Sequence, residues 1–181
     1  MNIELKILDW FQTLHTPVLD KFMTSVTKLG NAGIFWIILT VLFLLIPKMR
    51  KTGVVMAAAL IIDLLLCNVL LKNLVARTRP YDVNTVIQLL VAKLRDYSFP
   101  SGHTAASFAS VAALYFAGEK KLWKPALVLA CLIAVSRLYL YVHYPTDVLG
   151  GVVIGIIAGY LGYRLVKVLE DKFSSMKNGG E

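Results

Sequence analysis

The sequence predicts an all-α fold, a polytopic membrane helix bundle of about five transmembrane helices preceded by amphipathic interfacial helices. Two observations lead to this fold class. Hydrophobic residues make up 57% of the 181 residues and charged residues only 17%, whereas soluble domains carry about 25% charged residues. Turn signals such as Pro47, Pro100 and Pro145 divide the chain into apolar segments that approach the roughly 20 residues a spanning helix needs. The length fits one domain.

The N-terminal segment, residues 1–31, has the pattern of amphipathic helices. Its apolar residues recur at helical spacing with charged residues between them: Ile3, Ile7, Leu8, Phe11 and Leu14, then Leu19, Phe22, Met23 and Val26. A helix of this kind lies in the membrane interface. A further full span is disfavoured, because charged side chains such as Asp9 and Lys21 would have to enter the lipid.

The membrane-embedded part is predicted to cover residues 32–170, with a flexible tail over residues 171–181. The segments expected to span are Ala32–Ile46, Gly53–Leu71, Thr104–Gly118, Leu122–Val142 and Val148–Val166. The connection over residues 80–100 contains its own apolar residues, and its pattern fits a short helix and a packed loop equally well.

Loop charges predict the orientation in the membrane. Alternation of five spans places on one side the basic residues Lys48, Arg50, Lys51, Lys120, Lys121, Lys124, Arg164, Lys167, Lys172 and Lys177. Because cytoplasmic loops are enriched in Lys and Arg, this side is expected to be cytoplasmic. The net charge of +8 then reflects topology. Nucleic acid is not expected as a partner, since the basic residues are spread along the chain.

A first candidate site element is the basic stretch that starts at Lys72. Lys72 and Arg79 are seven residues apart and would share one face of a continuous helix. Arginine matches phosphate oxygens with a planar fork, and lysine adds a point charge. The pair therefore predicts a phosphate-binding site at the end of the second span.

A second element is the stretch Pro100-Ser101-Gly102-His103. Proline and serine are start signals for the helix that follows, and glycine lets backbone approach a ligand closely. The free N–H groups of a helix N-terminus bind anions. His103 at this end is placed to donate a proton.

The third element follows the fourth span and contains Arg137, His143 and Asp147. A carboxylate bonded to one imidazole nitrogen makes the other nitrogen a better nucleophile. His143 is therefore the candidate nucleophile. No cluster with metal-ligand spacing accompanies it, so we expect neither a metal nor another cofactor.

Together these stretches resemble the signature of the type 2 phosphatidic acid phosphatase family, which is similar to glucose-6-phosphatase and the vanadium haloperoxidases. The signature is Lys-x6-Arg-Pro, Pro-Ser-Gly-His and Ser-Arg-x5-His-x3-Asp, and every position is present between Lys72 and Asp147. The resemblance implies that His143 attacks phosphorus, Asp147 orients it and His103 is the acid and base. It also implies phosphoryl binding by Lys72, Arg79, Ser101, Gly102 and Arg137.

The expected function is hydrolysis of a lipid phosphate or diphosphate at the extracytoplasmic face of the plasma membrane. Undecaprenyl diphosphate, phosphatidylglycerol phosphate and phosphatidic acid remain open as substrates. Two alternatives also remain: a lipid phosphotransferase with the same phosphohistidine, and a non-catalytic lipid-phosphate binding or transport protein. Membrane lipids are the expected partners, and the sequence predicts no oligomeric state.

Overall fold

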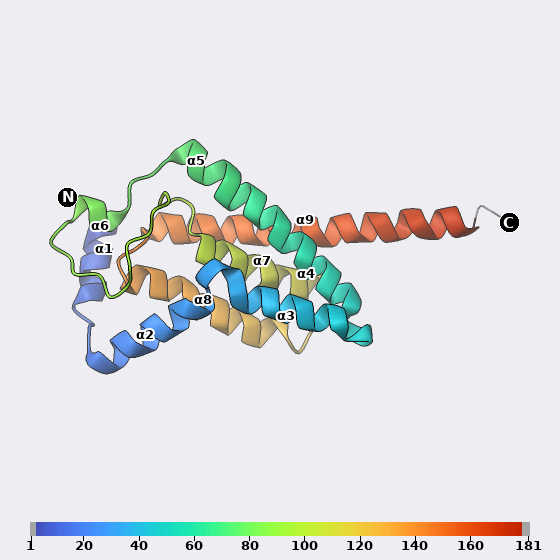
Figure 1. The fold of residues 1–181 in the computed structure, drawn as a ribbon, viewed down its shortest axis with the longest axis horizontal. Coiled ribbons are helices and arrows are strands. Elements are labelled where there is room, and N and C mark those ends of the chain that lie inside the picture. The colour runs from blue at the N-terminus through green and yellow to red at the C-terminus, as the bar shows by residue number, and fades with distance from the viewer. Residues whose placement is uncertain (1–2, 179–181) are drawn as a thin grey trace.

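A computed structural model describes residues 3–178, and every regular element within this range is helical (Figure 1). The elements are α1 (Ile3–Gln12), α2 (Pro17–Leu29), η1 (Asn31–Gly33), α3 (Ile34–Leu45), η2 (Pro47–Met49), α4 (Arg50–Asp63), the π-helical η3 (Leu64–Leu71), α5 (Lys72–Val75), α6 (Pro80–Val83), α7 (Gly102–Phe116), α8 (Trp123–Tyr139) and α9 (Pro145–Asn178).

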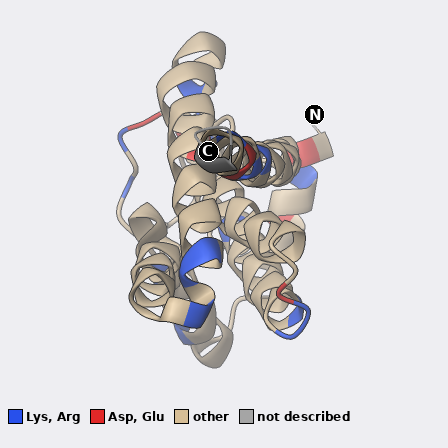
Figure 2. Ribbon diagram, turned by 90° about the vertical axis from the view of Figure 1, so that its right-hand side faces the viewer, with Lys and Arg blue, Asp and Glu red and all other residues tan. Residues whose placement is uncertain are grey.

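Different helices and loops lie at the two ends of the bundle. The α3–α4 turn, the α7–α8 loop and the last turns of α9 lie toward one end, while α1, α6 and the connection before α7 lie toward the other (Figure 1). Figure 2 looks onto the end from which α9 projects, where Lys and Arg lie at turns that face the viewer. We call the opposite end, with α1 and α6, the site end.

Helices α7 and α9 are in close contact, and this contact positions the residues of the site end. A Cβ added at Gly151, Gly155 or Gly159 would lie 2.7, 2.4 or 2.4 Å from atoms of α7 or of the residue before it, so only glycine allows this approach. Small residues every four positions are typical of helix contacts in membranes. The contact brings the first turn of α9 to the start of α7, where the Ser101 N–H donates to the Asp147 carbonyl at 3.0 Å.

The N-terminal helices cover part of the bundle. Leu8 of α1 is fully buried in a cluster with Tyr81, Tyr139, Tyr141 and Val142. Helix α2 packs on α8. Gly30 and η1 separate α2 from α3, which is inclined to it by 45°. The position of α1 and α2 relative to the membrane stays a prediction.

Within the described residues, two helical stretches are long and apolar enough to cross a membrane, Pro47–Val83 and Pro145–Met176, and the bent pair of α2 and α3 adds a third if it is one span. Many apolar side chains on α3, α4 and α9 are exposed, including Ile38, Ile61 and Val153. Large exposed apolar surfaces mark contact with lipid or protein. Helices α7 and α8 have 15 and 17 residues, and the count of five spans stays a prediction.

At its C-terminal end the structure extends α9 beyond residue 170, and between α6 and α7 it decides between the two alternatives that the sequence left open. Residues 171–178 belong to α9, although a flexible tail was predicted from residue 171; Leu169, Phe173 and Met176 continue the helical spacing and no proline interrupts it. Residues 179–181 of that tail lie outside the described residues. Between α6 and α7 the chain is a packed loop, in which Ile87, Leu89, Val91 and Leu94 contact the cluster around Leu8.

Candidate active site

His143 lies at the centre of the site end, in the short loop between α8 and α9. Its side chain is buried, and its Nε2 lies 3.4 Å from Nη1 of Arg79. A guanidinium only donates hydrogen bonds, so this contact assigns the lone pair to Nε2 and the proton to Nδ1. Nδ1 faces Oδ2 of Asp147 at 3.6 Å. In this tautomer Nε2 is the ring atom with a free lone pair, the one able to act as a nucleophile.

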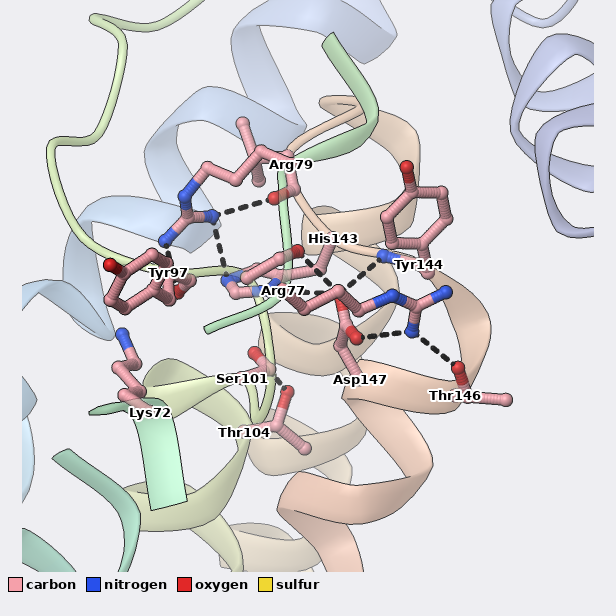
Figure 3. Close-up of polar contacts among 12 residues, drawn as sticks. Lys72, Arg77, Arg79, Tyr97, Ser101, Thr104, His143, Tyr144, Thr146 and Asp147 are labelled. Atoms are coloured by element: carbon pink, nitrogen blue, oxygen red, sulfur yellow. Dashed lines mark hydrogen bonds and ion pairs between the residues drawn. The ribbon is translucent and has the colours of Figure 1, made fainter. Parts of the chain in front are cut away.

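Asp147, in the first turn of α9, is fully buried and held from several directions. Its Oδ2 accepts from Ser98 Oγ at 2.5 Å and from the Tyr144 N–H at 2.9 Å, and its Oδ1 accepts from Arg77 Nη1 at 2.6 Å. These donors fix the carboxylate beside His143. Figure 3 shows the Arg77 guanidinium between Asp147 and Thr146.

Sequence reasoning missed Arg77 and Ser98. Arg77 also contacts Glu4 of α1, with Nη2 2.5 Å from Oε2, so the N-terminal helix is tied to the His143–Asp147 pair. Both residues could have been found because they lie close in sequence to signature residues. Arg77 lies in the basic stretch of Arg79, and Ser98 lies two residues before Pro100.

Lys72 and Arg79 converge as predicted, but they do not share a helix face. The helix ends at Val75, because Ala76 takes a left-handed conformation with φ 46°. Arg79 then approaches from the following loop, where Nη1 donates to the Val142 carbonyl at 2.7 Å. Both cations are buried, and both contact the carboxylate of Asp96.

Asp96 is a further residue that the sequence analysis missed. Lys72 contacts its Oδ2, and Arg79 Nη2 lies 2.6 Å from its Oδ1. Partial burial raises the pKa of Asp96, but the hydrogen bond and charge of Lys72, and then those of Arg79, outweigh it and lower the pKa to about 2. The carboxylate is therefore ionised at neutral pH.

Arg137, near the end of α8, is a third buried cation. Its Nη1 donates to Thr27 Oγ1 at 2.5 Å, while its Nε is buried without a partner among the described residues. A buried guanidinium N–H without an acceptor is costly. An anion bound beside Arg137 would satisfy this donor.

The start of α7 supplies the remaining predicted residues. Ser101 is buried at the helix N-terminus and its Oγ lies 3.0 Å from Thr104 Oγ1. A Cβ at Gly102 would lie 3.0 Å from Asn68 Oδ1, so glycine leaves room for that amide. His103 Nε2 lies 2.9 Å from Asn31 Oδ1. His103 lines the same cavity as Gly102, Lys72 and Asp96, so the structure brings these residues together.

An apolar groove adjoins this cluster at Lys72, Gly102 and His103. It has a volume of about 590 Å³ and is lined by α3, α4, η3 and α7. Ile37, Val41 and Leu64 line its apolar walls, and Lys72 and His103 line its polar end. Among the described residues, no group of three His, Cys, Asp or Glu side chains is arranged to hold a metal ion.

Fold and site together define a class: a membrane protein made of a helical bundle, with a histidine–carboxylate pair beside buried cations that suit a phosphoryl group. Comparison with known families agrees with this class. The sequence model of the PAP2 superfamily matches residues 52–171. The chain belongs to the PAP2 superfamily.

Known relatives cover nearly the whole chain. An undecaprenyl-diphosphatase of Sulfolobus acidocaldarius is 30% identical over 165 residues, which are 91% of this chain and 78% of the relative. The crystal structure of LpxE from Aquifex aeolicus has a TM-score of 0.78 at 28% identity and covers 91% of this chain and 96% of its own. The crystal structure of a transmembrane PAP2-type phosphatidylglycerolphosphate phosphatase from Bacillus subtilis has a TM-score of 0.72 at 30% identity. The match covers 94% of this chain and 85% of that structure's chain.

Proposed function

We propose that this protein is a membrane lipid phosphatase that hydrolyses a lipid phosphate or diphosphate through a phosphohistidine at His143. The observation that carries the proposal is the ring of His143: its unprotonated Nε2 lies beside Arg79, and its Nδ1 faces a carboxylate held by Arg77 and Ser98. A non-catalytic phosphate-binding protein needs the cations but not this oriented pair.

In the first half-reaction, Nε2 of His143 attacks phosphorus as the bond from phosphorus to the leaving oxygen breaks. His103 gives a proton to that oxygen, which leaves as the lipid alcohol or, from a diphosphate, as the lipid monophosphate. Lys72, Arg79 and Arg137 stabilise the charge on the phosphoryl oxygens, with Ser101 and the N–H of Gly102 as further donors. Phosphoryl transfer depends largely on such positioning and charge stabilisation.

In the second half-reaction, water attacks the phosphohistidine. His103, now unprotonated, takes a proton from the water as the bond between phosphorus and Nε2 breaks. Inorganic phosphate and the starting form of both histidines result. Asp147 stabilises the proton on Nδ1 of His143 throughout.

The groove supports a lipid as the substrate. Several of its apolar lining residues, such as Ile37, Val41 and Ile61, are exposed on the surface of α3 and α4, and Lys72 and His103 line its polar end. A phosphate group at that end would place a hydrocarbon chain in the groove. The relatives named for undecaprenyl diphosphate and phosphatidylglycerol phosphate make these two lipids, with phosphatidic acid, the substrates to test first.

We further propose a location in the plasma membrane, five spans within residues 32–170, an interfacial segment over residues 1–31 and a site on the extracytoplasmic face. The basic α3–α4 turn and α7–α8 loop lie at the end opposite α1, α6 and the start of α9 (Figures 1 and 2), and His143 lies just before α9 in the chain. The positive-inside tendency supports a cytoplasmic position for that end.

Release of inorganic phosphate by the purified protein from these lipids tests the function. His143→Ala should abolish turnover while the protein keeps its melting temperature. His15→Ala is the matched control, because His15 stacks on Tyr139 outside the cation cluster, and it should retain activity. Rapid quenching with labelled substrate should trap acid-labile phosphate on wild type and on His15→Ala, but not on His143→Ala. Near-normal turnover in His143→Ala would end the phosphohistidine proposal, and labelled acceptor lipid without free phosphate would indicate a phosphotransferase.

A further inference from the structure

We propose that Asp96 is a built-in competitor of the substrate: its carboxylate occupies the phosphoryl position between Lys72 and Arg79, and the phosphoryl group must displace it to bind. The inference rests on the proposed function, because it assigns these cations to the phosphoryl oxygens. It adds a residue outside the signature that determines how strongly the site holds free anions.

The contacts of Asp96 are those expected of a phosphoryl group. One carboxylate oxygen contacts the ammonium of Lys72, and the other lies 2.6 Å from Nη2 of Arg79. Two phosphoryl oxygens would divide between a lysine and an arginine in the same way. The other N–H groups of Arg79 are occupied as well: Nη1 contacts the Val142 carbonyl and His143 Nε2, Nη2 also contacts the Tyr97 carbonyl, and Nε donates to the Asp96 carbonyl at 2.8 Å. A second anion therefore finds no open side on Arg79.

The Asp96 side chain is much more exposed than the two cations that it contacts. The Asp96 side chain is 50% exposed, whereas those of Lys72 and Arg79 are 8% and 2% exposed. The carboxylate therefore covers the cations on their exposed side, and it lines the groove together with Lys72 and His103. An anion that enters through the groove meets Asp96 before it meets the buried Arg79.

The backbone around Asp96 allows a local displacement. Leu94 is anchored on one side, because its N–H donates to the Tyr81 hydroxyl at 3.1 Å and its carbonyl accepts from that hydroxyl at 2.9 Å. On the other side the Ser98 N–H donates to the Arg77 carbonyl at 2.8 Å. The residues between these anchors, 95–97, are exposed. Within this segment the carbonyls of Asp96 and Tyr97 also accept from Arg79, at 2.8 and 3.2 Å. A phosphoryl group that takes over Arg79 therefore releases residues 95–97 between the two anchors, which stay in place.

Because an anion binds only to molecules in which Asp96 has left the cations, its apparent affinity is the intrinsic affinity multiplied by the fraction of such molecules. This reduction applies to every anion. A lipid phosphate offsets the loss by burying its chain in the groove. Inorganic phosphate has no chain, so Asp96 keeps it from occupying the empty site and displaces it after hydrolysis.

Asp96→Asn tests the proposal, since it keeps the shape and removes the charge. We expect inorganic phosphate and vanadate to bind the purified variant at least about tenfold more tightly in isothermal titration calorimetry. Asp96→Glu keeps the charge and should stay within about threefold of wild type. The matched control is Asp82→Asn: Asp82 is 45% exposed, pairs with Lys93 at 3.5 Å and should not alter binding. Equal or weaker anion binding by Asp96→Asn would overturn the proposal.

A second measurement retains Asp96 and does not depend on the folding of that variant. A spin label on Arg95→Cys, with Cys67 and Cys131 replaced by Ser, should become more mobile when vanadate is added. Unchanged mobility at saturating vanadate would contradict the displacement. Binding needs no turnover, so tighter binding by Asp96→Asn without phosphate release from any lipid would refute the proposed function alone. Normal hydrolysis with no tightening would refute this inference alone.

Discussion

Arg77→Gln should slow turnover although Arg77 belongs to no signature position. The substitution removes the donor 2.6 Å from Oδ1 of Asp147, a carboxylate that is fully buried. Ser98 and the Tyr144 N–H remain on Oδ2, so the carboxylate keeps part of its support but becomes free to turn away from Nδ1 of His143.

The expected fall in kcat follows from the strength of the hydrogen bond that Arg77→Gln removes. A hydrogen bond between charged groups contributes about 1.5–3 kcal/mol. The Arg77 side chain is 25% exposed, which favours the lower half of that range. If the loss falls on the transition state, about 1.5–2 kcal/mol corresponds to a kcat roughly 10 to 30 times lower, at 1.36 kcal/mol per tenfold change.

The assay is phosphate release under saturating lipid, with thermal unfolding of each variant measured in parallel. Glu4→Gln tests the other partner of Arg77 and should lower kcat less, because it leaves the Arg77–Asp147 contact in place. Lys93→Gln, at an exposed pair 3.5 Å long, is the control for loss of a surface ion pair. A kcat within twofold of wild type in a folded Arg77→Gln variant would refute the reasoning, since Asp147 would then need no support from Arg77.

Three further predictions follow from the site and the topology. His103→Ala should lower kcat by about 10²–10⁴, the usual contribution of a general acid and base, and a loss below tenfold would contradict its role. Turnover should persist in excess EDTA, and complete loss with rescue by Mg²⁺ would show that a metal is required. With Cys67 and Cys131 replaced by Ser, a membrane-impermeant thiol reagent on intact cells should label Gln88→Cys and spare Lys121→Cys; the reverse pattern would place the site in the cytoplasm.

Local signals in the sequence predicted much of this architecture. Helix α7 begins directly after Pro100 and Ser101, and α9 begins at Pro145, as their start signals indicate. Apolar runs predicted helices close to the observed α3, α4, α7, α8 and α9. The signature also predicted that Arg79 and Asp147 lie beside His143, because histidine, arginine and carboxylate side chains are costly in an apolar chain unless they interact.

Only the tertiary structure decided how those residues pair. Arg77 and Arg79 lie in one basic stretch, yet Arg77 binds Asp147, 70 residues away, and Arg79 binds Asp96, 17 residues away. The direction of each side chain depends on where the helix ends and on the left-handed turn at Ala76, and no periodicity in the sequence encodes these. The contact of α1 with Arg77 and the position of Asp96 over the cations likewise result from packing between distant segments. The sequence by itself determined a membrane helix bundle with phosphate chemistry, because hydrophobicity and residue type are local properties. The arrangement of its charges required the fold, because each pair joins segments that only packing brings together.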